Sequence, residues 1–365
     1  MFQNILIALV IFFGAAAFYL AYERFTRRTR ATKSELYIDA LRDLLDERKE
    51  SAFSKLRQVI AEDTNNIDAY LRLGQILRDH NQHERALQVH KDLTLRTGLD
   101  RSDKLQILRQ LVTDYIKLND LTTAEKALHE LISLDSKNRW AHATLLQVRE
   151  QQGAWDKAYD TAVTLLKLES NKSKKPLARY KFQMAQQLYK KREYHKARIV
   201  YKEALGLDPT MVDAYLAIGD SYALESRLED AVNFWKKLIS AVPEKGHLVI
   251  ERLKKTLFDL GRYGDMLEIC ESILEHEPRN KAARRTLAEF HEKKGDTDLA
   301  CEQLEGLLED YPGDISTLVE VVRLYLERKE RRKLDELLRS IERAQAKRKD
   351  LSGSTPTPDT TPVGS

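Results

Sequence analysis

The sequence predicts an all-α protein in which one transmembrane helix precedes a superhelical solenoid of about nine helix pairs. Three features lead to this fold class: few turn-forming residues, an uncharged N-terminal stretch, and a pattern that recurs about every 34 residues. Glycine and proline together make up 22 of the 365 residues, too few for a turn-rich β protein. Charged residues at 32% and apolar residues at 42% are typical of many amphipathic helices with a large surface.

Residues 5–22 form the predicted anchor. They read ILIALVIFFGAAAFYLAY, eighteen residues without a charge. A helix of this length spans roughly 27 Å, close to the hydrocarbon thickness of a bilayer. A cleaved signal peptide is the alternative, because Ala15–Ala17 are small. However, Met1–Asn4 supply no basic side chain before the apolar stretch, as a signal peptide would. We therefore expect an uncleaved single-pass anchor that contacts the lipid bilayer.

A short basic segment follows the anchor. Residues 23–33 hold five basic groups and one acidic group, and the rest of the chain contains equal numbers of both signs, so this cluster accounts for the net charge of +4. Basic residues concentrate on the cytoplasmic flank of a membrane helix, so we expect the bulk of the chain to lie in the cytoplasm. The charge gives no indication of a nucleic-acid-binding surface. We define residues 23–32 as a basic linker.

The rest of the chain contains a recurring sequence pattern. Prolines at 209, 243, 278 and 312 are spaced by 34, 35 and 34 residues, and each follows an apolar helical stretch. A small residue recurs at one phase, with a methionine filling one place: Ala86, Ala124, Ala158, Ala197, Ala231, Met266 and Ala300. A small side chain lets two helices cross closely, and proline ends the second helix of a pair. One pair cannot bury its apolar faces alone, so the pairs are expected to stack.

The phase of these markers places the repeat units. They are expected to begin near Lys33, Ile67, Leu105, Arg139, Ala178, Val212, His247, Lys281 and Ile315. Two longer intervals require polar insertions, one around Gly98 and one ending at Pro176. The solenoid is thus predicted over residues 33–346. Residues 347–365, rich in serine, threonine and proline, are predicted to be a disordered tail.

The pattern resembles the tetratricopeptide repeat. The copy that matches best runs from Val212 to Lys245 and carries the expected small, aromatic and proline positions: Tyr215, Gly219, Tyr222, Ala231, Trp235 and Pro243. Such repeats form a concave groove lined by the first helix of each pair. The resemblance implies that proteins bind there, through residues at five phases of each unit.

When the groove phases of this repeat are transferred to the present sequence, they give these candidate groove residues: Arg78, Arg109, Lys117, Trp140, Gln147, Arg179, Phe182, Tyr189, Lys190, Lys255, Phe258 and Arg285. This mixed aromatic and cationic lining suits a peptide or a partner helix with acidic groups. The alternative is that several of these side chains only solvate the helix face. No asparagine occupies the ninth phase, so the carboxylate clamp of chaperone receptors is not expected.

Motifs for catalysis are absent from the sequence. It contains no phosphate-binding glycine loop, no nucleophile elbow and no zincin motif, so we predict no enzyme, no cofactor and no metal. His80 and His83 lie in a predicted turn with His90 beyond; a metal site is the alternative to a solvated turn. Cys270 and Cys301 fall near core phases of different units and are expected to be buried apolar groups.

A closer resemblance is to the lipopolysaccharide assembly protein B family. It rests on the anchor with its arginines, on the opening unit YIDALRDLL, and on EDTNNIDAYLRLGQILRDHNQHERALQVHKDL, LRQLVTDYIKLNDLTTAEKAL and LLQVREQQGAWDKAYDTAVTLLKL. The resemblance implies an inner-membrane, cytoplasm-facing adaptor that brings the committed deacetylase of lipid A synthesis to a membrane AAA protease. The family's C-terminal rubredoxin-like metal module needs two C-x-x-C pairs, and this sequence has none.

Two alternatives stay open at this point. The chain could be a generic repeat scaffold for another envelope complex, such as one for secretion, division or pilus assembly. An enzyme or a periplasmic lipoprotein-like factor is the third possibility, and no motif supports it.

Overall fold

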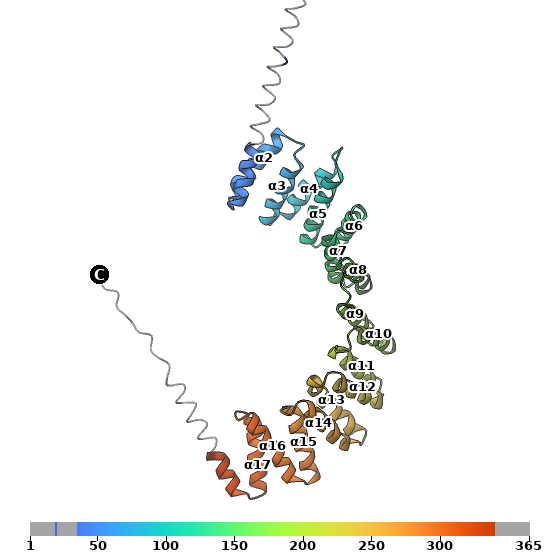
Figure 1. Cartoon of the computed structure of the whole chain (residues 1–365), viewed down its shortest axis with the longest axis vertical. Helices are drawn as coiled ribbons and strands as arrows, with labels where there is room; N and C mark the ends of the chain where they lie inside the picture. Colours follow the sequence, from blue (N-terminus) through green and yellow to red (C-terminus); the bar gives the residue numbers. More distant parts are fainter. Residues whose placement is uncertain (1–18, 20–34, 340–365) are drawn as a thin grey trace, which may run out of the picture. The chain divides into compact units, whose positions relative to one another are not determined.

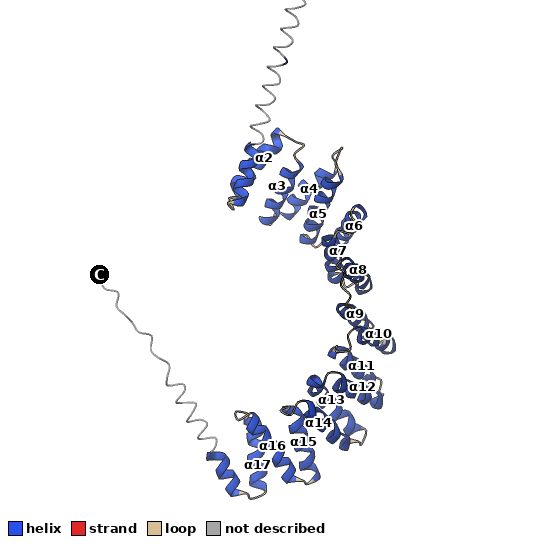
Figure 2. Ribbon diagram, viewed as in Figure 1, coloured by secondary structure: helices blue, strands red, loops and turns tan. Residues whose placement is uncertain are grey.

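The computed structural model describes Tyr19 and residues 35–339. These residues form helices joined by short turns, and no strand occurs among them (Figure 2). Within the described range, no helix is both long and apolar enough to cross a membrane. Apart from Tyr19, the predicted anchor at residues 5–22 lies outside the described residues, as do the linker at 23–32 and the tail at 347–365.

The helices follow one another in antiparallel pairs, and the chain divides into two compact units, Met1–Tyr180 and Lys181–Ser365. In the first unit, residues 35–45 are helical and precede α2 (Lys49–Glu62), α3 (Ile67–Asp79), α4 (His83–Thr94), α5 (Arg101–Lys117), α6 (Leu121–Leu134), α7 (Arg139–Gln151), α8 (Trp155–Leu168) and the short η1 (Lys175–Leu177). Each helix packs mainly on the helices before and after it in the chain (Figure 1).

The second unit continues the same order. Its elements are α9 (Ala178–Lys190), which begins just before the division, α10 (Tyr194–Leu207), α11 (Val212–Leu224), α12 (Leu228–Ala241), η2 (Pro243–Val249), α13 (Ile250–Asp259), η3 (Tyr263–Asp265), α14 (Met266–His276), α15 (Lys281–Lys294), α16 (Thr297–Asp310), α17 (Ile315–Glu327) and a helical segment at 331–339. The described residues therefore hold nine helix pairs, so the all-α solenoid is confirmed at the level of fold.

The crossing point is fully closed in the seven pairs that carry a residue at the small phase. All seven residues at the small phase, from Ala86 to Ala300, have no exposed surface. The glycines of the first helices are equally constrained: a Cβ atom on Gly219 would lie 2.1 Å from Nε1 of Trp235. Trp235 is itself buried, as expected for a core aromatic. Small residues therefore set the distance between the two helices of a pair.

The bend inside each pair uses one backbone conformation. A residue with positive φ stands at the bend of every described pair: Glu47, Asn81, Asn119, Gly153, Arg192, Ser226, Gly261, Gly295 and Lys329. This left-handed conformation reverses the chain within two or three residues after the first helix. Only three of the nine residues are glycine, which has no steric penalty there.

The first helices begin at defined caps. The side chains of Asn66, Asn138 and Asn280 accept hydrogen bonds from the third backbone N–H after them, at the start of α3, α7 and α15. These bonds satisfy donors that a helix leaves unpaired at its N-terminus. The starts predicted at residues 67, 139 and 281 agree with these caps.

Two predicted unit starts are shifted. The unit expected near Leu105 begins four residues earlier, because Asp100 caps α5 by accepting from the backbone N–H of Asp103. The unit expected at His247 begins within η2, and α13 starts only at Ile250. Pro243 opens η2, where its missing N–H costs nothing, so the chain turns through a 3-10 helix before α13.

Candidate binding surfaces on the first helices

Three first helices of the first unit enclose a cleft. It has a volume of about 460 Å³, and its lining comes from α3, α5 and α7: Gln75, Arg78, Gln106, Arg109, Gln110, Thr113 and Trp140. Three predicted groove residues, Arg78, Arg109 and Trp140, therefore meet at one place. The lining contains two guanidinium groups, amides, a hydroxyl and an indole, and no carboxylate. We call these seven residues the α3–α5–α7 cleft.

Arg78 is held in place in one wall of this cleft. Its guanidinium group donates to Asp114 Oδ1 over 2.6 Å and to Gln110 Oε1 over 2.6 Å. Asp114 is fully buried, and the Arg78 side chain is only 11% exposed. A buried carboxylate that pairs with a guanidinium fixes its orientation through charge-assisted hydrogen bonds. Arg78 is therefore pre-positioned in the cleft wall.

Behind Asp114 lies His90, which is fully buried on α4. Its Nδ1 lies 2.5 Å from Asp114 Oδ2, and its Nε2 lies 3.3 Å from the carbonyl oxygen of Leu71. Both ring nitrogens thus face oxygen atoms of neighbouring helices, which fixes the orientation of the ring. Gly74 makes room for it, since a Cβ atom there would lie 2.2 Å from His90 Nε2.

His90, which lies beyond the predicted turn, is buried, and Asp114 gives its ring a partner. His80 stays near the surface, with Nε2 3.9 Å from Glu50. The part of the chain that the structure describes holds no group of three potential metal ligands.

Arg109 and Trp140 form the other wall of the cleft. The Arg109 guanidinium lies 4.7 Å from the centre of the Trp140 ring, a cation–π contact between successive first helices. Trp140 is half-buried and also packs against the apolar core around α6 and α7. Trp140 therefore packs against the core and also lines the cleft.

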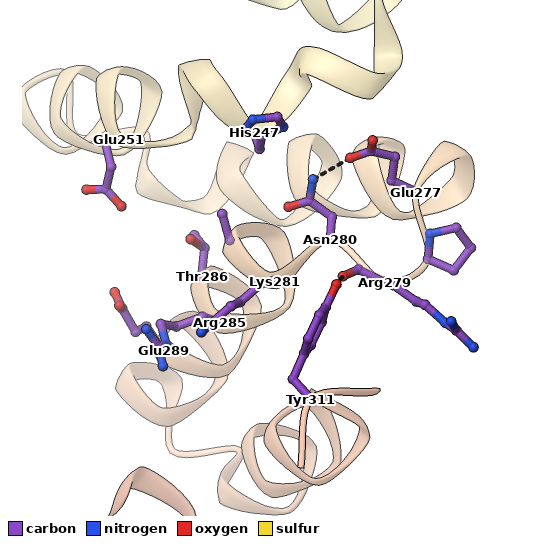
Figure 3. A pocket seen from close by; sticks show the side chains of 12 residues that line it. His247, Glu251, Glu277, Arg279, Asn280, Lys281, Arg285, Thr286, Glu289 and Tyr311 are labelled. Carbon is purple, nitrogen blue, oxygen red and sulfur yellow. Dashed lines mark hydrogen bonds between the residues drawn. The ribbon is translucent and has the colours of Figure 1, made fainter. Parts of the chain in front are cut away.

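A second pocket, of about 700 Å³, lies in the second unit (Figure 3). It is lined by His247, Glu251, Glu277, Pro278, Arg279, Asn280, Lys281, Ala282, Arg285, Thr286, Glu289 and Tyr311. We call it the Arg285 pocket, after the one predicted groove residue in it. Three acidic and three basic side chains line it together, so it lacks the single charge sign of the α3–α5–α7 cleft.

Contacts with the next pair hold the residues of the Arg285 pocket in place. Arg285 donates to Ser316 over 2.5 Å and to Thr317 over 2.9 Å, both on α17. Tyr311 donates to the carbonyl oxygen of Arg279 over 3.0 Å. Asn280 donates to Glu277 over 2.6 Å, as the dashed line between them in Figure 3 shows. Arg285 therefore joins two helix pairs through its Nη2, whereas its buried Nε lies 3.6 Å from Glu320 without a hydrogen bond.

The other predicted groove residues are not gathered into either pocket. Phe182 and Tyr189 are partly buried in a core cluster, where they pack against Tyr201 and Tyr194. Arg179 pairs with Glu150 and lies 4.7 Å from the Tyr180 ring. The remaining five are exposed: Lys117, Gln147, Lys190, Lys255 and Phe258. For Phe182 and Tyr189, the structure favours packing over an open groove.

Phase reasoning missed several residues of the α3–α5–α7 cleft. Gln75 and Thr113 stand at the ninth phase of their units, and Gln106 stands at the second. The same phase rule could therefore have identified all three as groove residues. Gln110 and the buried Asp114 stand outside the groove phases. Only the contact between neighbouring pairs brings these two side chains to Arg78.

Residues 182–244 and residues 257–327 each match a family model described as a tetratricopeptide repeat. With the helix pairs and the first-helix surfaces, these matches define the class: a helix-pair repeat scaffold of the kind used for protein–protein interaction.

Among curated proteins, the chain is similar to Lipopolysaccharide assembly protein B of Escherichia coli strain K12, with 23% identity over 76% of this chain and 71% of that protein. It is also similar to the protein of the same name from Haemophilus influenzae, with 25% identity over 55% of this chain and 50% of that protein. The predicted resemblance to this family is confirmed. These matches are repeat and assembly proteins rather than enzymes, in agreement with the prediction of a non-enzymatic chain.

The chain also aligns with solved structures at low similarity. The yeast Sti1 TPR2AB domain in complex with pHSP90 aligns with 15% identity and a TM-score of 0.39, over 74% of this chain and 96% of that chain. The crystal structure of MamA aligns with 18% identity and a TM-score of 0.29, over 56% and 95%. The assignment of the fold rests on the helix pairs themselves.

Proposed function

We propose that this protein is a membrane-tethered adaptor whose α3–α5–α7 cleft binds an acidic segment of a partner protein. The observation that supports this is the charge of the cleft lining. The buried Asp114 balances the charge of Arg78, so Arg109 gives the lining its net positive charge, and no carboxylate lines the cleft. Trp140 adds an aromatic surface of the type that dominates binding energy at interfaces. The buried Asp114 holds Arg78 in place, which lowers the entropy cost of binding.

The similarity to Lipopolysaccharide assembly protein B supports a more specific proposal. In it, the chain is anchored once in the bacterial inner membrane by residues 5–22, with its bulk in the cytoplasm. There it presents the lipid A deacetylase to a membrane AAA protease and so regulates lipopolysaccharide synthesis. Tethering raises the effective concentration of the adaptor beside a membrane protease without any new contact.

Capture of partners from membranes tests the binding surface. The full-length tagged chain is crosslinked in membranes, solubilised and purified, and the captured proteins are quantified. Arg109→Glu reverses one charge in the cleft and should lower capture of the specific partner at least tenfold. Lys126→Glu makes the same charge change at an exposed site on α6 and should leave capture unchanged. Equal capture by both variants would contradict the cleft as the binding site.

Depletion of the chain tests the pathway separately. Under the adaptor proposal, both the deacetylase level and the amount of lipopolysaccharide should rise. Unchanged levels of both, together with intact capture of another envelope protein, would favour the alternative of a scaffold for secretion, division or pilus assembly.

A further inference from the structure

The basic side chains of the Arg285 pocket are already paired with acids that lie outside the pocket. Lys281 pairs with Asp314 over 2.7 Å, and Arg285 Nε lies 3.6 Å from Glu320. Both acids belong to the helix pair that follows and do not line the pocket. The Arg279 side chain is 81% exposed, and Figure 3 shows it extending away from the pocket. The three bases therefore offer little positive charge to a ligand.

Two carboxylates of the pocket lack a partner of opposite charge. Glu289 pairs with Lys254, but neither Glu251 nor Glu277 forms a salt bridge with any residue in the described part of the chain. Glu277 accepts a hydrogen bond from Asn280 Nδ2, which leaves acceptor positions open on its carboxylate. Figure 3 shows Glu251 and Glu277 on opposite sides of the pocket. The unpaired charge of the pocket is therefore negative.

A buried hydroxyl in the pocket is a second observation, independent of charge. Thr286 is only 3% exposed, yet it lines the pocket. Its hydroxyl forms no hydrogen bond with another residue that the structure describes. Most buried polar side-chain groups in proteins have a hydrogen-bond partner, and a threonine hydroxyl can accept as well as donate. Thr286 therefore marks a position in the pocket where a hydrogen-bonding group of a ligand can bind.

We propose that the Arg285 pocket binds a basic segment of a partner protein, whose lysine or arginine side chains pair with Glu251 and Glu277. Thr286 accepts a hydrogen bond from this segment. The pocket volume of about 700 Å³ is sufficient, since ligand sites measure about 300–1,000 Å³. Tyr311 adds a ring on which a guanidinium group can stack.

This site is separate from the α3–α5–α7 cleft and has the opposite charge preference. The cleft lining carries the positive charge of Arg109 and no carboxylate, whereas the unpaired groups of the Arg285 pocket are carboxylates. One chain can therefore bind an acidic segment in its first unit and a basic segment in its second unit. Neither binding event requires the other.

Peptide selection on the full-length chain tests the proposal. The chain is held in lipid nanodiscs, a phage-displayed library of random heptapeptides is selected on it, and the bound peptides are sequenced. Peptides with two or more lysine or arginine residues should be enriched at least tenfold over the starting library. Selection on Arg109→Glu should keep this basic class and lose the acidic class expected for the cleft, so the two proposals can fail separately. Absence of a basic class would overturn the present one.

The affinity of one selected basic peptide, measured by fluorescence anisotropy, locates its site. Glu251→Gln combined with Glu277→Gln should weaken binding at least tenfold. Glu244→Gln combined with Glu275→Gln removes the same two charges at exposed sites that do not line the pocket, and this control should bind within twofold of the parent. Thr286→Val should weaken binding about fivefold, the effect of one hydrogen bond.

Circular dichroism melting curves establish that the variants are folded. The curve of the Glu251→Gln and Glu277→Gln chain should match that of the parent, because neither carboxylate forms a salt bridge with a described residue. Unchanged affinity in that chain, an equal loss in the control chain, or unchanged affinity with Thr286→Val would each overturn the assignment of the basic segment to this pocket.

Discussion

Gly219 illustrates how strongly this fold depends on single side chains at the helix crossing. Because a Cβ atom would lie 2.1 Å from the buried Trp235, the indole or a helix must shift when one is added. We predict that Gly219→Ala lowers the free energy of unfolding by about 1–3 kcal/mol, the usual effect of overpacking a core. The measurement is chemical denaturation followed by circular dichroism.

The matched control is Gly206→Ala on α10, where the added Cβ atom would meet nothing within 4 Å. Alanine is the better helix former, so this variant should be as stable as the parent or slightly more stable. Equal destabilisation by both substitutions would contradict the close approach at Gly219.

Asp114 is the second residue on which much depends. It carries its charge without exposure, between the Arg78 guanidinium and the His90 ring. Asp114→Asn removes the charge that pairs with Arg78, and loss of one partner from a buried ion pair costs about 3–5 kcal/mol. The midpoint of urea denaturation should fall accordingly. Asp92→Asn, at an exposed site on α4, is the control and should change the midpoint little.

The cysteines yield a prediction about pH. Burial raises the pKa of the Cys270 thiol to about 12, so very little thiolate is present at pH 8. Burial also raises the pKa of Cys301. Neither thiol of the native protein should react appreciably with a thiol reagent at pH 8, whereas both should react rapidly in urea. Rapid native labelling would show that these residues are not core groups.

At the scale of helices, the contact between α15 and the start of α17 makes the stability of the fold depend on pH. A hydrogen bond from Lys281 Nζ, and a second from Thr317, hold the pKa of Asp314 below its ordinary value. A carboxyl with a lowered pKa in the folded state stabilises the protein above its ordinary pKa. This contribution is lost as the pH falls through the lowered value.

Asp314→Asn should therefore cost about 1 kcal/mol at pH 7 and nothing near pH 2, with the difference vanishing as pH falls below about 4. Glu302→Gln, at an exposed site on α16, should show no such dependence. Melting curves at a series of pH values measure both variants; a cost that persists at low pH would count against this ion pair.

The elements were largely predictable from sequence because their signals are local. The prolines, the small phase and the asparagine caps each act within one helix pair, so the starts at Val212, Lys281 and Ile315 followed from spacing. The start of α13 could not be predicted from the spacing, because residues that the phase assigns to an α-helix form the 3-10 helix η2. The cleft was predictable only in part: phase located Arg78, Arg109 and Trp140, but Gln110 and Asp114 reach Arg78 through contacts between pairs.

For the whole molecule, the proposed function depends on placing a binding surface at a membrane. We predict that deletion of residues 1–22 leaves a folded solenoid, since the described helix pairs contain their own cores, but weakens function. The truncated chain should show the same circular dichroism melting curve as the full chain. Complementation of a depletion strain should be incomplete. Full complementation by the truncated chain would refute the argument for tethering.

The left-handed residue at every bend has a practical consequence for engineering. Glu47, Arg192, Ser226 and Lys329 hold a conformation that costs non-glycine residues roughly 1–2 kcal/mol. Glycine or asparagine would relieve that cost without touching the core or the α3–α5–α7 cleft. The hairpin corners are therefore the sites at which a heat-tolerant version of this scaffold can be built, one pair at a time, while its recognition surfaces stay as they are.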